Sequence, residues 1–194
     1  MEYRAARPDE MPVIRTVLAR ALADDPLVQW NFPVVDKAQE RLSLVALYFL
    51  LAVERFVLQG RSFVAVGDGR VVGAALWMPP GMQRVPSLPR PLDLMTLLLG
   101  EDALLANGEL FERARDGAPE CEGFYLAQLG VLPEHRAAGV GSELMRYCMA
   151  ELPGPLWAES ANPRNVGFYQ RLGFAVVHRA PLFDSTLTRL SLRK

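Results

Sequence analysis

Apolar residues recur along the chain with two different periods, and each change of period marks a new element. Over residues 8–23 the apolar positions lie three and four residues apart, which predicts a helix. Asp36 is expected to cap a second helix that lasts to about Leu58. The apolar runs 61–66 and 70–78 are joined by Gly67-Asp68-Gly69, a pattern typical of a β-hairpin.

The second half of the chain alternates between short apolar runs and helical spacing. The run 124–131 suits a strand that is buried on both faces, and it is followed by a small-residue turn and then by Leu144, Met145, Cys148 and Met149 at helical spacing. The remaining predicted strands are 3–6, 155–160, 175–179 and 183–192, and the remaining predicted helices are 92–99, 102–115 and one through Phe168 and Tyr169. This mixture predicts an α/β (α+β) fold in one domain, residues 1–194.

Residues 82–122 interrupt this alternation. Pro86, Pro89 and Pro91 mark an irregular connector, and the two helices predicted after it form an insertion. A long inserted connection of this kind is either a surface hairpin, such as a dimer contact, or a lid that shapes a binding site.

Composition excludes several classes of protein. Apolar residues make up 51% of the chain, which is too many for a disordered chain, and the formal net charge of −1 gives no basic field for nucleic acid or an anionic membrane. Cys121 and Cys148 do not combine with His135 and His178 into a metal-binding spacing. The sequence shows no secretory signal core and no apolar run of about 20 residues, so we expect a cytoplasmic protein.

The turn after the strand 124–131 carries the first chemical signal. Arg136-Ala137-Ala138-Gly139-Val140-Gly141 leaves backbone N–H groups bare at a helix start, where the helix dipole favours a phosphate. A dinucleotide fingerprint would need Gly or Ala at Leu144, and a P-loop would need a Lys before Ser142. The spacing that remains is Arg-x-x-Gly-x-Gly.

This spacing resembles the acyl-CoA pyrophosphate loop of the GNAT (general N-acetyltransferase) superfamily. A second segment, 155–174, strengthens the resemblance, because Asn162-Pro163-Arg164-Asn165 and Phe168-Tyr169 follow in the order and at the separation typical of that superfamily. Residues 23–26 followed by Trp30, together with 160–165, are similar to the puromycin N-acetyltransferase branch.

The resemblance implies an architecture and a cofactor. The fold would be a mixed, mostly antiparallel sheet flanked by helices, with splayed fourth and fifth strands and acetyl-CoA between them. The residues implied in binding this cofactor are Leu129, Gly130, Val131, Arg136, Ala137, Ala138, Gly139, Val140, Gly141, Ser142, Asn162, Asn165 and Phe168. No metal is implied.

The implied chemistry is attack of a neutral amine on a thioester. Tyr169 is expected to protonate the departing thiolate, and the Val131 N–H to stabilise the oxyanion. Glu159 is the first candidate for the base, while water or one of Asp24, Asp25, Glu122 and His178 remains open. Asp25, Trp30 and Phe32 are expected to contact the acceptor.

The function expected from these features is acetyl transfer from acetyl-CoA to a primary amine of a small molecule. Two alternatives stay open: an acetyltransferase for protein N-termini or lysines, and a non-catalytic acyl-CoA sensor. A monomer and a homodimer are both compatible with the sequence.

Overall fold

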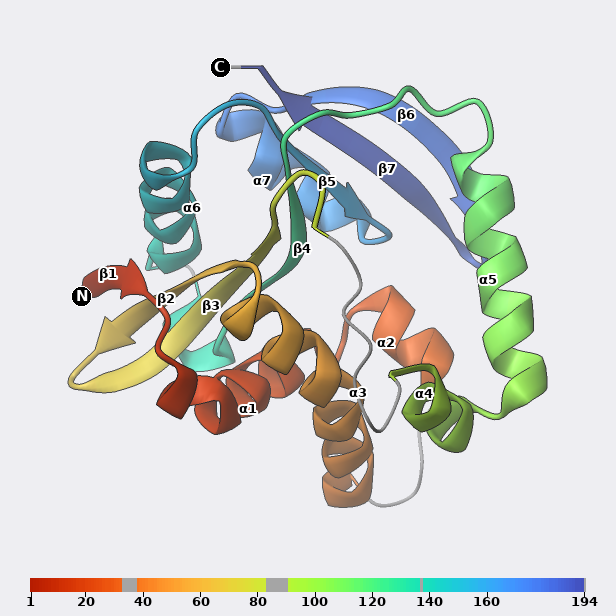
Figure 1. Cartoon of the computed structure of the whole chain (residues 1–194), viewed down its shortest axis with the longest axis horizontal. Coiled ribbons are helices and arrows are strands. Elements are labelled where there is room, and N and C mark those ends of the chain that lie inside the picture. The colour runs from red at the N-terminus through yellow and green to blue at the C-terminus, as the bar shows by residue number, and fades with distance from the viewer. Residues whose placement is uncertain (33–37, 83–90, 137, 194) are drawn as a thin grey trace.

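The computed structural model describes residues 1–32, 38–82, 91–136 and 138–193. Asp36, Pro86 and Pro89 therefore lie outside the described residues. The elements, in chain order (Figure 1), are β1 (Glu2–Ala5), a 3-10 turn (Pro8–Glu10), α1 (Met11–Leu22), α2 (Pro26–Asn31), α3 (Ala38–Leu58), β2 (Arg61–Gly67), β3 (Arg70–Met78), α4 (Pro91–Leu99), α5 (Glu101–Arg115), β4 (Phe124–Val131), a 3-10 turn (Pro133–His135), α6 (Val140–Glu151), β5 (Leu156–Ser160), α7 (Pro163–Arg171), β6 (Ala175–Leu182) and β7 (Ser185–Leu192).

The strands form one seven-stranded sheet in the order β1-β2-β3-β4-β5-β7-β6. All neighbouring pairs are antiparallel except β4 and β5, which confirms the mixed, mostly antiparallel sheet. The β4–β5 ladder joins Phe124, Tyr125 and Leu126 to Leu156, Trp157 and Ala158. Both strands continue beyond it, to Val131 and Ser160, without pairing to each other, so they splay apart at their carboxyl ends.

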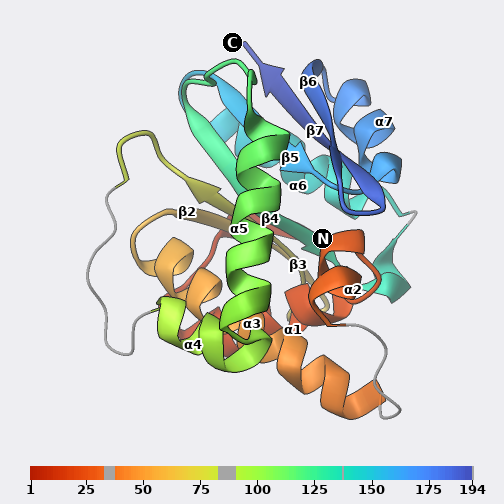
Figure 2. The same ribbon diagram turned by 90° about the vertical axis from the view of Figure 1, so that its right-hand side faces the viewer.

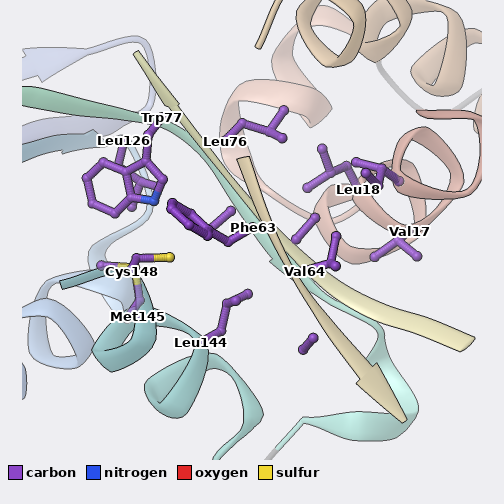
Figure 3. Close-up of a cluster of buried hydrophobic side chains, with 14 of the residues drawn as sticks. Val17, Leu18, Phe63, Val64, Leu76, Trp77, Leu126, Leu144, Met145 and Cys148 are labelled. Carbon is purple, nitrogen blue, oxygen red and sulfur yellow. The ribbon is translucent and has the colours of Figure 1, made fainter. Parts of the chain in front are cut away.

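Helices cover both faces of the sheet, because its central strands are apolar on both sides. Val17 and Leu18 of α1 pack on one face, and Leu144, Met145 and Cys148 of α6 pack on the other (Figure 3). The helix α7 lies on the α6 face, and α3 packs beside α1 on the opposite face (Figure 1). None of the helices in the described ranges is long and apolar enough to cross a membrane.

The helix α2, which contains Trp30, is absent from the elements that the sequence pattern predicts. Asp25 caps this helix by accepting a hydrogen bond from the Leu27 N–H at 3.1 Å, and Pro26 takes the first helical position. A helix of six residues is too short to show a hydrophobic period, so the pattern could not reveal it.

The closing hairpin spans the predicted residues 175–192, but β6 is longer than predicted and β7 begins later, at Ser185. The strand β6 continues through Pro181 to Leu182. It is an edge strand, and a proline is tolerated there because its missing N–H removes no internal ladder bond.

The insertion places α5 across the face of the sheet that α1 and α3 also cover (Figure 2). His178 Nε2 lies 2.9 Å from the Ala114 carbonyl oxygen, and Trp30 Nε1 donates to Asn107 Oδ1 at 2.8 Å. Ala114 also packs into a small apolar cluster with Leu182 and Leu187. These contacts tie α5 to α2 and to the β6–β7 hairpin.

Candidate active site

Two cavities meet where β4 and β5 splay. The first, of about 560 Å³, lies beside residues 135–142 and is called here the glycine-loop cavity. The second, of about 490 Å³, lies beneath α5 and is called the α5 cavity. The residues that line both define the junction, and they are Leu22, Asp25, Leu129, Asn165 and Tyr169.

The start of α6 forms one wall of the glycine-loop cavity. Gly139 is the residue before the helix and has φ of 76°, a left-handed conformation that favours glycine. Among the described residues no side chain caps this helix, and a Cβ built on Gly139 would meet nothing within 4 Å. Gly141 and Ser142 line the same cavity. The bare N–H groups and the helix dipole thus face open space that suits an anion.

The residues before Gly139 in the loop differ in how they relate to the cavity. Ala137 lies outside the described residues, and Ala138 is exposed. Arg136 donates from Nη2 to the Ala21 carbonyl oxygen at 2.5 Å, so its guanidinium ties the loop to the C-terminal end of α1 while it lines the cavity.

The end of β4 contributes three residues to the glycine-loop cavity. Leu129, Gly130 and Val131 line it. A Cβ at Gly130 would lie 2.9 Å from the Ala21 Cβ and 3.0 Å from Leu18 Cδ2. The glycine is therefore required by the packing of α1 against the sheet, independently of any ligand.

The start of α7 forms the opposite wall. Asn162 caps the helix, with Oδ1 accepting from the Arg164 N–H at 3.1 Å. Asn165 Nδ2 donates to Ser160 Oγ at 3.2 Å. Phe168 lines the glycine-loop cavity and packs edge-on against Tyr169, with ring centroids 5.1 Å apart. These contacts fix the orientation of the Tyr169 ring.

Tyr169 and Asp25 are the two titratable groups at the junction. Burial, reinforced by the charge of Asp25, raises the pKa of Tyr169 well above its ordinary value, so the phenol stays protonated at neutral pH. Burial also raises the pKa of Asp25, opposed by hydrogen bonds from the Leu27 N–H and from Asn162 Nδ2, which lies 3.5 Å away. The pair therefore combines a proton donor with a carboxylate that readily accepts a proton.

Glu159 lines the α5 cavity, and its surroundings differ from those of Asp25. Its side chain is 4% exposed, and its carboxylate accepts from Arg189 Nη2 at 2.7 Å and from Arg115 Nε at 3.0 Å. A carboxylate shared by two guanidinium groups has its lone pairs occupied and its charge balanced. This geometry disfavours Glu159 as a base compared with Asp25.

Trp30 and Phe32 are not among the described residues that line either cavity. Trp30 is 44% exposed and stacks on Phe183 at 5.2 Å. Phe32 is buried and packs edge-on against Tyr48, with centroids 5.5 Å apart. Their contact with an acceptor stays a prediction.

Sequence reasoning missed most of the α5 cavity. Its lining includes Tyr48, Phe49, Phe111, Tyr125 and Gln128. The register of β4 against β3 shifts at Ala127, which forms a bulge within this lining, as bulges beside active sites often do. In the sequence, these aromatic residues occupy positions typical of a hydrophobic core, and the pattern does not show that they meet around one cavity.

Comparison with known proteins identifies the family. The model of the acetyltransferase (GNAT) family matches residues 20–174. The chain belongs to this family. The splayed strands β4 and β5 agree with the fold that the sequence resemblance implied. Gly139 directly precedes α6, and Tyr169 lies on α7.

Solved structures with this fold include acetyltransferases of several kinds. The histone acetyltransferase HPA2 and related acetyltransferase of Corynebacterium glutamicum superposes with a TM-score of 0.74 at 23% identity, covering 97% of this chain and 93% of that one. A mosquito arylalkylamine N-acetyltransferase like 5b gives 0.59 at 16%, covering 100% and 99%. A polyamine N-acetyltransferase of Drosophila melanogaster gives 0.58 at 17%, with the same coverage. At these identities the likeness shows the fold alone.

Proposed function

We propose that this chain is an acetyl-CoA-dependent N-acetyltransferase that acts on the primary amine of a small molecule by direct attack. The observation that carries the proposal is the junction. Tyr169 and Asp25 lie together there, between a backbone cradle for an anion and a cavity lined by aromatic rings.

The residues around the glycine-loop cavity fit the pyrophosphate and pantetheine of acetyl-CoA. The left-handed Gly139 leaves open space in front of uncapped N–H groups, as a bound pyrophosphate requires. Leu129, Gly130 and Val131 lie along the path from there to the junction, with Asn165 and Phe168 opposite. When bound, acetyl-CoA supplies the acetyl thioester that the acceptor attacks.

The chain's own residues then have three tasks. Asp25 holds the incoming ammonium and takes a proton from it, a task that the raised pKa of this carboxyl favours. The walls of the α5 cavity orient the amine toward the junction. Tyr169 gives its proton to the departing sulfur. The transfer forms a carbon–nitrogen bond and breaks a carbon–sulfur bond. The nitrogen loses two protons, one to Asp25 before attack and one that restores the Tyr169 hydroxyl after the sulfur is protonated, and Asp25 then releases its proton to solvent.

The helix that covers the α5 cavity supports a small acceptor over a peptide. A peptide groove needs an open edge or cleft, whereas α5 lies over this cavity and is tied down by Asn107 and Ala114. A protonated tyrosine at the junction supports catalysis over a purely sensing role.

Release of free thiol from acetyl-CoA across a panel of amines tests the proposal. We expect release to depend on a primary amine and to be matched by acetylated amine in mass spectrometry. Thiol release without an acceptor would favour a sensor or a hydrolase. Acetylation of a peptide N-terminus in preference to every small amine would favour the protein-directed alternative.

A further inference from the structure

The charged groups around the α5 cavity are distributed unevenly. At the junction, the half-buried carboxylate of Asp25 has no cationic partner among the described residues. Away from the junction, Glu159 and Arg115 line the cavity, and Arg189 lies behind Glu159. A buried carboxylate that lacks a cation attracts one, so the two ends of the cavity differ in what they can accept.

The group formed by Arg115, Glu159 and Arg189, called here the arginine clamp, carries surplus positive charge. Two guanidinium groups hold one carboxylate, with Arg115 on α5 and Arg189 on β7. Both Glu159 oxygens are occupied, Oε1 by Arg189 at 2.7 Å and Oε2 by Arg115 at 3.0 Å from its Nε. Neither oxygen is left to receive a second ammonium group.

We propose that the arginine clamp makes the α5 cavity selective for acceptors with a single positive charge and an uncharged far end, with Arg115 as the specificity-determining residue. This inference rests on the proposed function and deepens it, because it assigns the class of amine. It also assigns to the insertion a stated role in the choice of acceptor.

The physical reason for this selectivity is that the two ends of the acceptor meet different charges in the cavity. The first ammonium meets Asp25, whose charge is unpaired. A second ammonium would meet the surplus charge of the arginine clamp in a partly buried site, where a like-charge contact costs several-fold more than in water. A hydrocarbon or aromatic far end would instead be buried against Tyr48, Phe111 and Tyr125.

Glu112 is the other carboxylate that lines the cavity. It lies on α5 and is exposed, so solvent and salt screen its charge, as they partly screen Arg115, whose side chain is 45% exposed. Arg189 and Glu159, at 10% and 4%, are the desolvated members of the arginine clamp. The position of Glu112 at the solvent side does not offer a desolvated partner for a second ammonium.

A matched pair of amines tests the inference. Hexylamine and cadaverine have the same chain length, but hexylamine ends in a methyl group and cadaverine in a second ammonium. We expect kcat/KM to favour hexylamine by about tenfold or more, since an unpaired charge in a partly buried site discriminates at that level. We also expect hexylamine, and not cadaverine, to raise the melting temperature, a readout that does not need turnover.

Three variants assign the effect to Arg115. Arg115→Gln removes the surplus charge and should lower the hexylamine-to-cadaverine ratio severalfold, leaving only the preference of the aromatic wall for a hydrocarbon end. Arg115→Lys keeps the charge and should keep the ratio. Arg113→Gln is the matched control, because Arg113 is an exposed arginine of the same helix, paired with Glu109, and its loss should leave the ratio unchanged.

Two results would overturn the inference. One is a wild-type protein that binds or uses cadaverine as well as hexylamine. The other is a folded Arg115→Gln variant with an unchanged ratio. Failure of the proposed function would give a different result from failure of this inference, because no primary amine would then be acetylated. The melting experiment would still report which amine the cavity binds.

Discussion

The two cavities meet at one junction, yet they are built from different parts of the chain and with different groups. The residues that line the glycine-loop cavity come mostly from the end of β4 through the start of α6 and from residues 162–171, and they include the uncapped start of α6. The α5 cavity is formed by residues from α1, α2, α3, α5, α7, β4, β5 and β7, which come together only in the folded chain.

This difference separates two kinds of recognition. Backbone N–H groups at a helix start bind a phosphate whatever the neighbouring side chains are, so the same cradle serves many acceptors. Side chains such as Arg115 and Phe111 set shape and charge, and a substitution there alters the choice of acceptor without touching the cradle. The junction residues belong to both cavities, and changes there should have the largest effects.

Tyr169→Phe should give the largest loss. It removes the proton donor but keeps the ring that packs against Phe168 and Phe174. General acid catalysis typically contributes on the order of 10²- to 10⁴-fold, so we expect kcat to fall within that range and KM for acetyl-CoA to change little. Steady-state kinetics measures both. An unchanged kcat in a reaction limited by chemistry would show that the thiolate leaves unaided.

Asp25→Asn should reduce kcat/KM by on the order of 10²-fold, because asparagine cannot take a proton. Since the folded-state pKa of Asp25 lies above its unfolded value, the contribution of this carboxyl to stability is greatest below the unfolded pKa and is lost as pH rises through the folded pKa. At neutral pH the variant should therefore melt no lower than wild type, and it should lose the pH dependence that the carboxyl imposes.

The capping role of Asp25 provides the control. Asparagine can still accept the hydrogen bond from the Leu27 N–H, whereas Asp25→Ala removes this cap. Alanine at this position should cost about 1 kcal/mol relative to asparagine. If Asp25→Asn retains wild-type activity across the pH range, the base is another group.

Gly139→Asp should act on the glycine-loop cavity alone. Asp and Asn both tolerate the left-handed conformation of Gly139, but only Asp adds a negative charge in front of the helix start. We expect Gly139→Asp to weaken acetyl-CoA binding by about tenfold or more through like-charge repulsion, and the matched Gly139→Asn to weaken it much less. The acetyl-CoA-dependent shift in melting temperature compares the two. Equal shifts would place the pyrophosphate elsewhere.

The difference between a cavity built from contiguous stretches and one built from distant residues also explains what the sequence could predict. The strand β4 has the predicted bounds, and the glycine loop follows it as expected, because contiguous motifs carry their own local signals. The base candidate Glu159 was harder to assess, since the arginines that occupy it come from positions 44 residues before and 30 residues after it. The pattern did not reveal the six-residue α2, which carries Trp30, and Trp30 and Phe32 line neither described cavity.

Gly108 offers a direct way to separate the cavities. It lies on α5 beside the α5 cavity, and a Cβ built on it would meet nothing within 4 Å. Gly108→Leu should therefore fill cavity space without a clash, and leucine is a better helix former than glycine by up to ~1 kcal/mol. Ala106→Leu, at an exposed position of the same helix, is the matched control.

Initial rates with acetyl-CoA and hexylamine both varied then test the central claim, that one cavity holds the donor and the other the acceptor. We expect Gly108→Leu to raise KM for hexylamine by about tenfold, a loss typical of a misfit in an apolar pocket, and to leave KM for acetyl-CoA near wild type. Gly139→Asp should do the reverse. If Gly108→Leu instead raises KM for acetyl-CoA, or if each variant raises both constants equally, the division of the site into two cavities is wrong.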